Sequence, residues 1–399
     1  MRGAAWVLLV VASCSAPRAQ PAAGGAAGVV GAAGPADRRA LALTLNDVSV
    51  LLPLPRDPGA PVLAALSEED AGMIDRGAYD AVVARGDIAP RAGGPVGFVD
   101  FHVVAVRFDL CDRSTVGPCP RDAVGRLRLV LQPLYLRDGV TFAHDIALHA
   151  FYAIPPEALA GVVDELRGLA RRQAARSAVL AVSPAAAAGD AAYLGGLRGL
   201  VRRYARAANL MRLTVIGQLA DSAAFAWVFR GVDRAGDGFA PLVIPGIEAA
   251  QQTAQLAGGD TVYRVDRMVD APAGFALATN GPRFAAATAE DRAAAVAALA
   301  EVQNPTRHDT GDTQCIGCHL ATYLTARRAA ASQIDPASLA AWFASPGARG
   351  VHTIASDDPR VVRAFGWAGN VPAISQRVVN DTATALAEIE ARFPAHAVR

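Results

Sequence analysis

The stretch HDTGDTQCIGCHLATYL, residues 308–324, contains two cysteines, Cys315 and Cys318, followed at once by His319. Two thiols separated by two residues, with an imidazole beside them, can hold a prosthetic group, coordinate a structural metal ion or form a redox disulfide. Each of the three chemistries requires different neighbouring residues, so the surrounding sequence indicates which one applies.

The C-x-x-C-H spacing resembles the haem-attachment site of c-type cytochromes. The resemblance implies one covalent haem c, with Cys315 and Cys318 joined to its vinyl groups and His319 as the proximal ligand of the iron. The spacing suits this chemistry, because two thiols one helical turn apart reach two vinyl groups while the next imidazole points at the iron. We therefore expect haem c as the cofactor.

Three other interpretations of the motif stay open. A structural zinc site would use His308 with Cys315, Cys318 and His319, although adjacent Cys318 and His319 strain a tetrahedral arrangement. A thioredoxin-like redox pair would follow a strand and lie near an aromatic residue, whereas a polar segment precedes Cys315. A plain structural disulfide within C-x-x-C is geometrically strained.

A haem iron bound by His319 would need a second axial ligand from elsewhere in the chain. Small cytochromes c commonly use a downstream methionine, and this chain has none after Met268. We predict His308, seven residues before Cys315, as the distal ligand, since seven extended residues span roughly 23–25 Å and can pass around a porphyrin edge. His352 is the alternative, followed by an open position.

Three further histidines are interpreted as structural: His102, His144 and His149. His144 and His149 are five positions apart, which places them on opposite faces of a strand. We therefore expect no second metal centre from them, and the sequence indicates no catalytic residue.

The first residues, MRGAAWVLLVVASC, have the pattern of an export signal that is too short to span a membrane stably. Val11 to Cys14 resembles the lipobox of bacterial lipoproteins, which implies cleavage after residue 13 and lipidation of Cys14. Residues 14–40, rich in Ala, Gly and Pro, are predicted to be a flexible tether. The expected location is the cell envelope, anchored by lipid and facing the periplasm or the cell surface.

Two other cysteines, Cys111 and Cys119, flank the loop CDRSTVGPC between two strand-like runs. In an exported protein such a pair predicts a disulfide across the loop, worth about 2–3 kcal/mol by loop entropy.

Composition narrows the choice of partners. Of the 399 residues, 52% are hydrophobic and 19% charged, with a net charge of +1, so nucleic acid is not an expected partner. All 38 basic side chains are arginine, which excludes Schiff-base and phosphate-loop lysine chemistry. The expected partners are a redox protein or the quinone pool, and a membrane through the N-terminal lipid.

The hydrophobic pattern predicts two folded parts. Residues 41–270 read as an α+β domain with an antiparallel sheet: strands are expected at 41–52, 103–110 and 126–132, and helices at 155–176 and 191–208. Residues 271–399 are predicted to be a mainly α-helical, cytochrome c-like domain, with Asp335 and Ser375 as helix caps.

Taken together, the chain resembles single-haem envelope lipoproteins of high-GC bacteria. The implied function is single-electron transfer by a membrane-anchored c-type cytochrome, more an electron carrier than a catalyst. Two alternatives remain: a non-enzymatic envelope binding lipoprotein whose motif is structural, or a haem-based peroxidase or sensor with an open sixth position.

Overall fold

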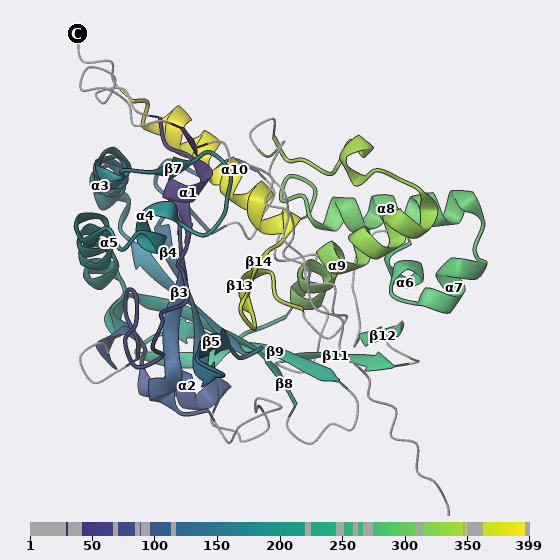
Figure 1. The fold of residues 1–399 in the computed structure, drawn as a ribbon, viewed down its shortest axis with the longest axis horizontal. Helices are drawn as coiled ribbons and strands as arrows, with labels where there is room; N and C mark the ends of the chain where they lie inside the picture. The colour runs from purple at the N-terminus through teal and green to yellow at the C-terminus, as the bar shows by residue number, and fades with distance from the viewer. Residues whose placement is uncertain are drawn as a thin grey trace, which may run out of the picture.

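A large antiparallel sheet forms the centre of the protein (Figure 1). The computed structural model describes residues 29–30, 42–66, 71–83, 88, 96–112, 117–219, 225–244, 251–257, 262–265, 274–308, 314–345, 348 and 362–395. Within these ranges the sheet has ten strands, in the order β12-β11-β9-β8-β6-β4-β3-β2, with β10 beside β9 and β5 beside β4.

The strands alternate in side-chain character, which explains how the sheet separates two different layers. In β4, Leu127, Leu129 and Leu131 are fully buried on one face while Arg126 and Arg128 point to the other. The sheet strands are β2 (Ser49–Leu51), β3 (Phe101–Asp109), β4 (Gly125–Arg137), β5 (Val140–Ala143), β6 (Ala147–Ile154), β8 (Leu210–Gln218), β9 (Ala226–Ala235), β10 (Gly238–Pro241), β11 (Gln251–Ala257) and β12 (Val262–Val265).

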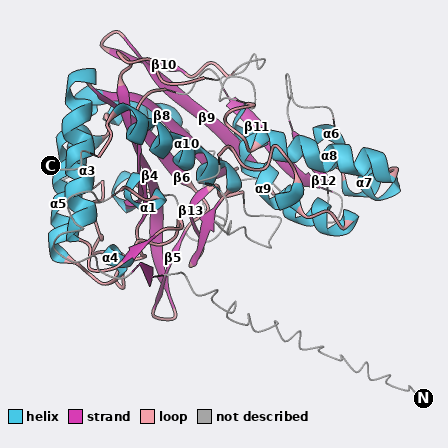
Figure 2. Ribbon diagram, turned by 90° about the horizontal axis from the view of Figure 1, so that it is seen from above, coloured by secondary structure: helices cyan, strands magenta, loops and turns pink. Residues whose placement is uncertain are grey.

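Helices cover both faces of the sheet, as the view from above makes plain (Figure 2). On one face lie α2 (Arg76–Val82), α3 (Leu159–Arg172) and α5 (Ala191–Tyr204), which share a hydrophobic core with the leucines of β4. On the other lie α8 (Ala289–Val302), α9 (Gln314–Ser332) and α10 (Gln376–Arg392), whose apolar side chains form a second core with β6, β8 and β9.

Short elements complete the described chain. They are α1 (Leu45–Val48), α4 (Pro184–Ala187), α6 (Phe275–Ala278), α7 (Gly281–Ala286), the paired strands β1 (Val29–Val30) and β7 (Arg176–Ser177), and the hairpin of β13 (Phe365–Ala368) and β14 (Val371–Ile374).

The prediction of an α+β domain followed by a separate, mainly α-helical haem-c domain is wrong. The dominant feature is the ten-stranded sheet, and the segment after residue 270 adds the β13–β14 hairpin and packs its helices on that sheet. The apolar stripes of α9 and α10 are covered by sheet residues such as Ile216 and Phe229, which the helical pattern alone does not reveal. The division of the chain at residue 270 remains a prediction, and the two stretches share a core.

The β13–β14 hairpin is attached to the sheet by buried polar contacts. Gln132 on β4 accepts a hydrogen bond from the Trp367 backbone N–H at 2.7 Å and donates to the Trp367 carbonyl at 2.9 Å. Gly366 has φ of 133°, and a Cβ there would collide with the Gln132 side chain. Glycine is therefore required at this close approach.

Two local predictions also need correction. The expected strand at 41–52 begins as helix α1, because the Asp47 carboxylate accepts a hydrogen bond from the Thr44 backbone N–H at 2.7 Å and caps the turn. The helix expected after Asp335 is a single 3-10 turn, Pro336–Ser338. The Ser375 cap is present, with Oγ accepting from the Val378 N–H at 3.2 Å at the start of α10.

The predicted signal peptide, Cys14 and most of the tether lie outside the described residues. None of the helices that the structure describes combines the length and apolar character needed to cross a membrane. Cys111 and Cys119 form a disulfide.

Candidate functional site

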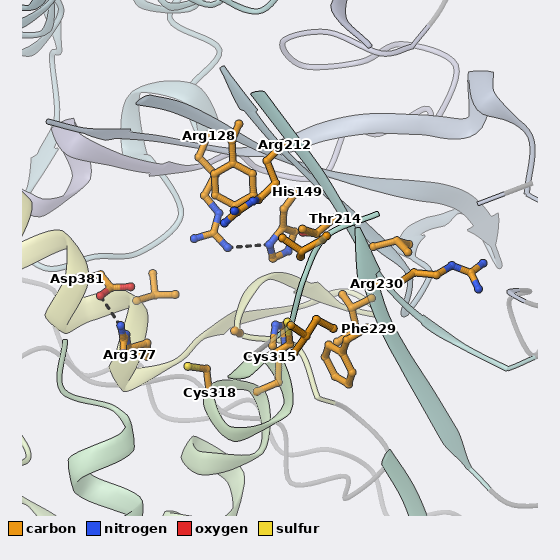
Figure 3. A pocket seen from close by; sticks show the side chains of 18 of the residues that line it. Arg128, His149, Arg212, Thr214, Phe229, Arg230, Cys315, Cys318, Arg377 and Asp381 are labelled. Atoms are coloured by element: carbon orange, nitrogen blue, oxygen red, sulfur yellow. Dashed lines mark hydrogen bonds and ion pairs between the residues drawn. The ribbon is translucent and has the colours of Figure 1, made fainter. Parts of the chain in front are cut away.

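A cavity of about 350 Å³ lies between the sheet and helices α9 and α10. Figure 3 shows Arg128 and His149 reaching into it from the sheet, while Cys315 and Cys318 approach from α9. Its size is within the range typical of cofactor sites. The lining residues are Asp112, Arg126, Arg128, His149, Phe151, Arg212, Thr214, Val215, Ile216, Phe229, Arg230, Leu242, Val243, Ile244, Cys315, Cys318, His319, Ala364, Ser375, Arg377, Val378 and Asp381.

The two motif cysteines are thiols in the first two turns of α9, and they are not joined to each other by a disulfide. Both line the cavity and both are half-buried. Desolvation, followed by the nearby Cys318, raises the pKa of Cys315 to about 11, so its sulfur carries a proton at neutral pH. Both side chains therefore line the cavity with sulfur, next to any group that binds in it.

His319 is held in one tautomer by the segment that precedes β13. Its Nδ1 lies 2.6 Å from the Val362 carbonyl oxygen, which can only accept, so Nδ1 carries the proton and Nε2 keeps its lone pair. Burial lowers the pKa of His319 to about 3, against the opposing effect of the Val362 hydrogen bond. The result is a neutral, oriented imidazole of the kind that binds a metal.

His149 lines the cavity from β6, where it pairs with Val130 on β4 and Thr214 on β8. The residue is 5% exposed, and its Nε2 is buried without a hydrogen-bond partner. Its Nδ1 lies 2.7 Å from the Arg128 guanidinium. Burial, then Arg128 and His319, hold the pKa of His149 well below its usual value of 6.5. The His149 and His319 ring centres are 6.2 Å apart.

Several arginines line the cavity, and most of them are already paired with carboxylates. Arg126 contacts Asp112 at 2.5 Å, Arg212 contacts Asp233 at 2.5 Å, and Arg377 contacts Asp381 at 3.0 Å.

Arg128 differs from these. Among the described residues it makes no ion pair with a carboxylate, and its Nε is buried without a partner. Burial lowers its pKa to about 10, so the guanidinium is still a cation at neutral pH. Asp109 and Asp381 act on this cation through their charges, but neither bonds to it directly, so the guanidinium is available to bind an anion in the cavity.

A buried polar network fixes helix α9 relative to its neighbours. Gln303, at the end of α8, donates to the Thr325 hydroxyl at 2.9 Å and accepts from the Thr322 hydroxyl at 2.6 Å. Asn380 on α10 donates to the Gln303 carbonyl at 2.8 Å, and the Gln376 N–H donates to Thr322 Oγ1 at 3.2 Å. These bonds hold the motif cysteines at a defined position over the sheet.

The structure brings together Cys315, Cys318 and His319, but not His308. The latter does not line the cavity, and its carbonyl accepts a hydrogen bond from Arg377 at 2.7 Å. His352 lies outside the described residues. In the part of the chain that is described, no three or more His, Cys, Asp or Glu side chains gather as a metal-ion site.

His149 was interpreted as structural from the sequence, and Arg128 was not predicted to be a site residue. A signal was present, because polar residues at every second position, such as Arg126 and Arg128, mark a sheet face that is not an ordinary apolar core. What was lacking was the identity of the helix that covers this face. His144, which was compared with His149, instead packs against the Tyr135 ring with centroids 4.3 Å apart.

No known protein family, curated protein or solved structure matches this chain.

Proposed function

We propose that this protein is a single-haem c-type cytochrome that transfers electrons in the bacterial cell envelope. The observation that carries the proposal is the convergence of two thiols and one neutral, tautomer-fixed imidazole on a single cavity. A structural zinc site needs four converging donors, and among the described residues no three His, Cys, Asp or Glu side chains gather as a metal-ion site.

The residues of this chain fit a haem in three ways. Cys315 and Cys318 would attach it, each S–H adding across a vinyl double bond so that sulfur bonds to one carbon and hydrogen to the other, with no net oxidation. His319 would bind the iron through Nε2, because Nδ1 is engaged by Val362. When bound, the haem supplies a one-electron couple.

The charge lining the cavity is the second support. Haem carries two propionates, and a porphyrin inserted beside Arg128 would give that guanidinium the carboxylate partner that the described residues do not provide. Phe151 and Phe229 offer the apolar surface that a porphyrin ring needs.

The location follows from the N-terminal pattern. A lipid on Cys14 with the tether that follows would hold the folded body about 25–30 Å from a membrane surface. An electron carrier placed there would exchange electrons with a redox protein or with the quinone pool.

The test is a reduced-minus-oxidised absorption spectrum of protein co-expressed with haem c maturation machinery. We expect an absorption band that survives acid–acetone extraction and is lost in a Cys315→Ala, Cys318→Ala variant. A Cys111→Ala, Cys119→Ala variant is the matched control, because it removes two cysteines outside the motif and should keep the haem.

A colourless protein under these conditions would contradict the proposal. Stoichiometric zinc in that sample would support the non-enzymatic binding lipoprotein with a structural motif.

A further inference from the structure

His149 and the motif histidine, His319, line the same cavity, although the two residues are 170 positions apart in the sequence. His149 comes from the centre of the sheet, on β6, and His319 comes from α9 on the opposite wall. Their rings are 6.2 Å apart between centroids, and the ring planes differ by 31°.

That separation has a chemical meaning. Two metal–nitrogen bonds of about 2.0–2.1 Å, plus roughly 1 Å from each ring centre to its nitrogen, put a pair of axial imidazoles about 6 Å apart. Packed ring pairs span about 4.5–7 Å between their centroids, a range that also contains this separation. The observed 6.2 Å matches two imidazoles that share one metal ion.

The Nε2 atom of His149 is the second observation. It is buried, it has no hydrogen-bond partner, and it belongs to a side chain that is 5% exposed. Leaving a buried polar atom unsatisfied costs about 1–3 kcal/mol, so this nitrogen would gain from a bonding partner that enters the cavity beside it.

Arg128 adds a requirement. A guanidinium can only donate, so its 2.7 Å contact places a lone pair on His149 Nδ1 and the ring proton on Nε2. Binding a metal through Nε2 therefore needs the proton to move to Nδ1, with no change in net charge, and Arg128 has to leave Nδ1. A propionate within reach of Arg128 would draw the guanidinium away.

We propose that His149 is the second axial ligand of the haem iron, and that Arg128 is a positioning residue which exchanges His149 for a haem propionate on loading. The inference rests on the proposed function and deepens it, because two imidazole ligands favour electron transfer over binding of an exogenous ligand. This assignment replaces the prediction of His308 as the distal ligand. His308 does not line the cavity, and its backbone carbonyl accepts a hydrogen bond from Arg377.

The experiment compares haem-loaded wild type, His149→Ala and His308→Ala by absorption and electron paramagnetic resonance spectroscopy. Covalent haem is measured separately, as haem retained by the denatured chain. We expect the wild type to be low-spin and closed to carbon monoxide. His149→Ala should keep its covalent haem, become high-spin, bind carbon monoxide stoichiometrically and return to low-spin with added imidazole. His308→Ala should match the wild type.

A second variant protects the test against misfolding. His149→Met keeps a ligand of another type, and we expect a low-spin iron with a more positive reduction potential. Arg128→Leu should stay low-spin, since Arg128 is not a ligand, and should lower the yield of loaded protein.

The outcomes separate the two claims. Wild type without covalent haem would overturn the proposed function itself. Covalent haem with His149→Ala still low-spin and closed, or with His308→Ala open, would overturn the assignment of His149 alone. Wild type that already binds carbon monoxide would do the same and would favour the sensor or peroxidase alternative.

Discussion

Buried imidazoles make the haem-free protein sensitive to acid. The folded-state pKa of His149 lies well below 6.5, so the unfolded chain takes up a proton that the folded chain refuses. The contribution of neutral His149 to the free energy of unfolding is fully present above about pH 6.5, the pKa of the imidazole in the unfolded chain. It is lost as the pH falls below that value toward the folded-state pKa. His319, with a pKa of about 3, behaves in the same way down to that pH.

The prediction is made for a Cys315→Ser, Cys318→Ser background, which cannot attach haem. Its free energy of unfolding should fall from pH 7 to pH 5, and part of that loss should be due to His149. Urea titrations with and without His149→Gln measure that share. Parallel curves for the two proteins would contradict the assignment of His149 as a buried neutral group.

The raised pKa of Cys315 predicts a slow reaction of its thiol with alkylating reagents. With a pKa of about 11, its thiol should react with iodoacetamide about 100-fold more slowly at pH 8 in the folded, haem-free protein than in urea. The Cys318→Ser variant isolates the reaction, and mass spectrometry follows it. Equal rates in the two states would show that the Cys315 sulfur is solvated.

How much of the site could be predicted depends on how local each relation is. Cys315, Cys318 and His319 are neighbours in the chain, so their spacing alone indicated their joint chemistry. His149 reaches the same cavity only through the pairing of β6 with β4 and β8 and the packing of α9 on that sheet. No spacing rule connects it to His319, which explains why His308 was preferred.

The position of the β13–β14 hairpin determines the orientation of the His319 ring. The Val362 carbonyl that orients the imidazole comes just before β13, and β13 is fastened to β4 through Gln132. Gln132 is fully buried and also donates to the His144 carbonyl at 2.9 Å.

We therefore predict that Gln132→Leu lowers the free energy of unfolding by about 2–4 kcal/mol. The substitution leaves the backbone N–H and carbonyl of Trp367 and the carbonyl of His144 without their hydrogen bonds to Gln132. Gln255→Leu, a half-buried residue on β11, is the matched control and should change stability little. Chemical denaturation measures both. Equal stability of the two variants would mean that the Gln132 hydrogen bonds do not stabilise the attachment of the hairpin.

Elements with a strong local signal were predicted well. The apolar alternation around Leu127 and Leu129 corresponds to β4, and the three-and-four spacing of Leu159, Val162 and Leu166 corresponds to α3. The hairpin was missed because β13 and β14 are four residues each, too short to show a period, and depend on Gln132 for their place. The turn at Leu45 was missed because a side-chain cap overrode a strand-like apolar pattern.

At the scale of the whole molecule, the sheet and the C-terminal helices share one hydrophobic core. Val130, Ile216 and Trp227 from the sheet pack in the same cluster as Leu320 and Leu324 of α9. The sequence could not reveal the shared core. The apolar pattern of the sheet strands and that of the C-terminal helices are each compatible with a separate hydrophobic core.

We predict that neither residues 41–270 nor residues 271–399 fold when expressed alone. Each fragment would expose the apolar face that the other covers. Thermal unfolding followed by circular dichroism should show no cooperative transition for either fragment, and co-expression should recover one. A haem-loaded 271–399 fragment with a sharp transition would restore the independent cytochrome domain that the sequence suggested.

The cysteines place opposite demands on the compartment that receives the chain. Cys111 and Cys119 are oxidised to a disulfide, whereas Cys315 and Cys318 are thiols. Under the proposed function, these two thiols would have to stay reduced until each sulfur had bonded to a vinyl group. A general oxidant would close both pairs, and a general reductant would open both. Haem attachment as proposed would therefore require a reductant that acts on the C-x-x-C pair and spares the disulfide, in which Cys111 is buried.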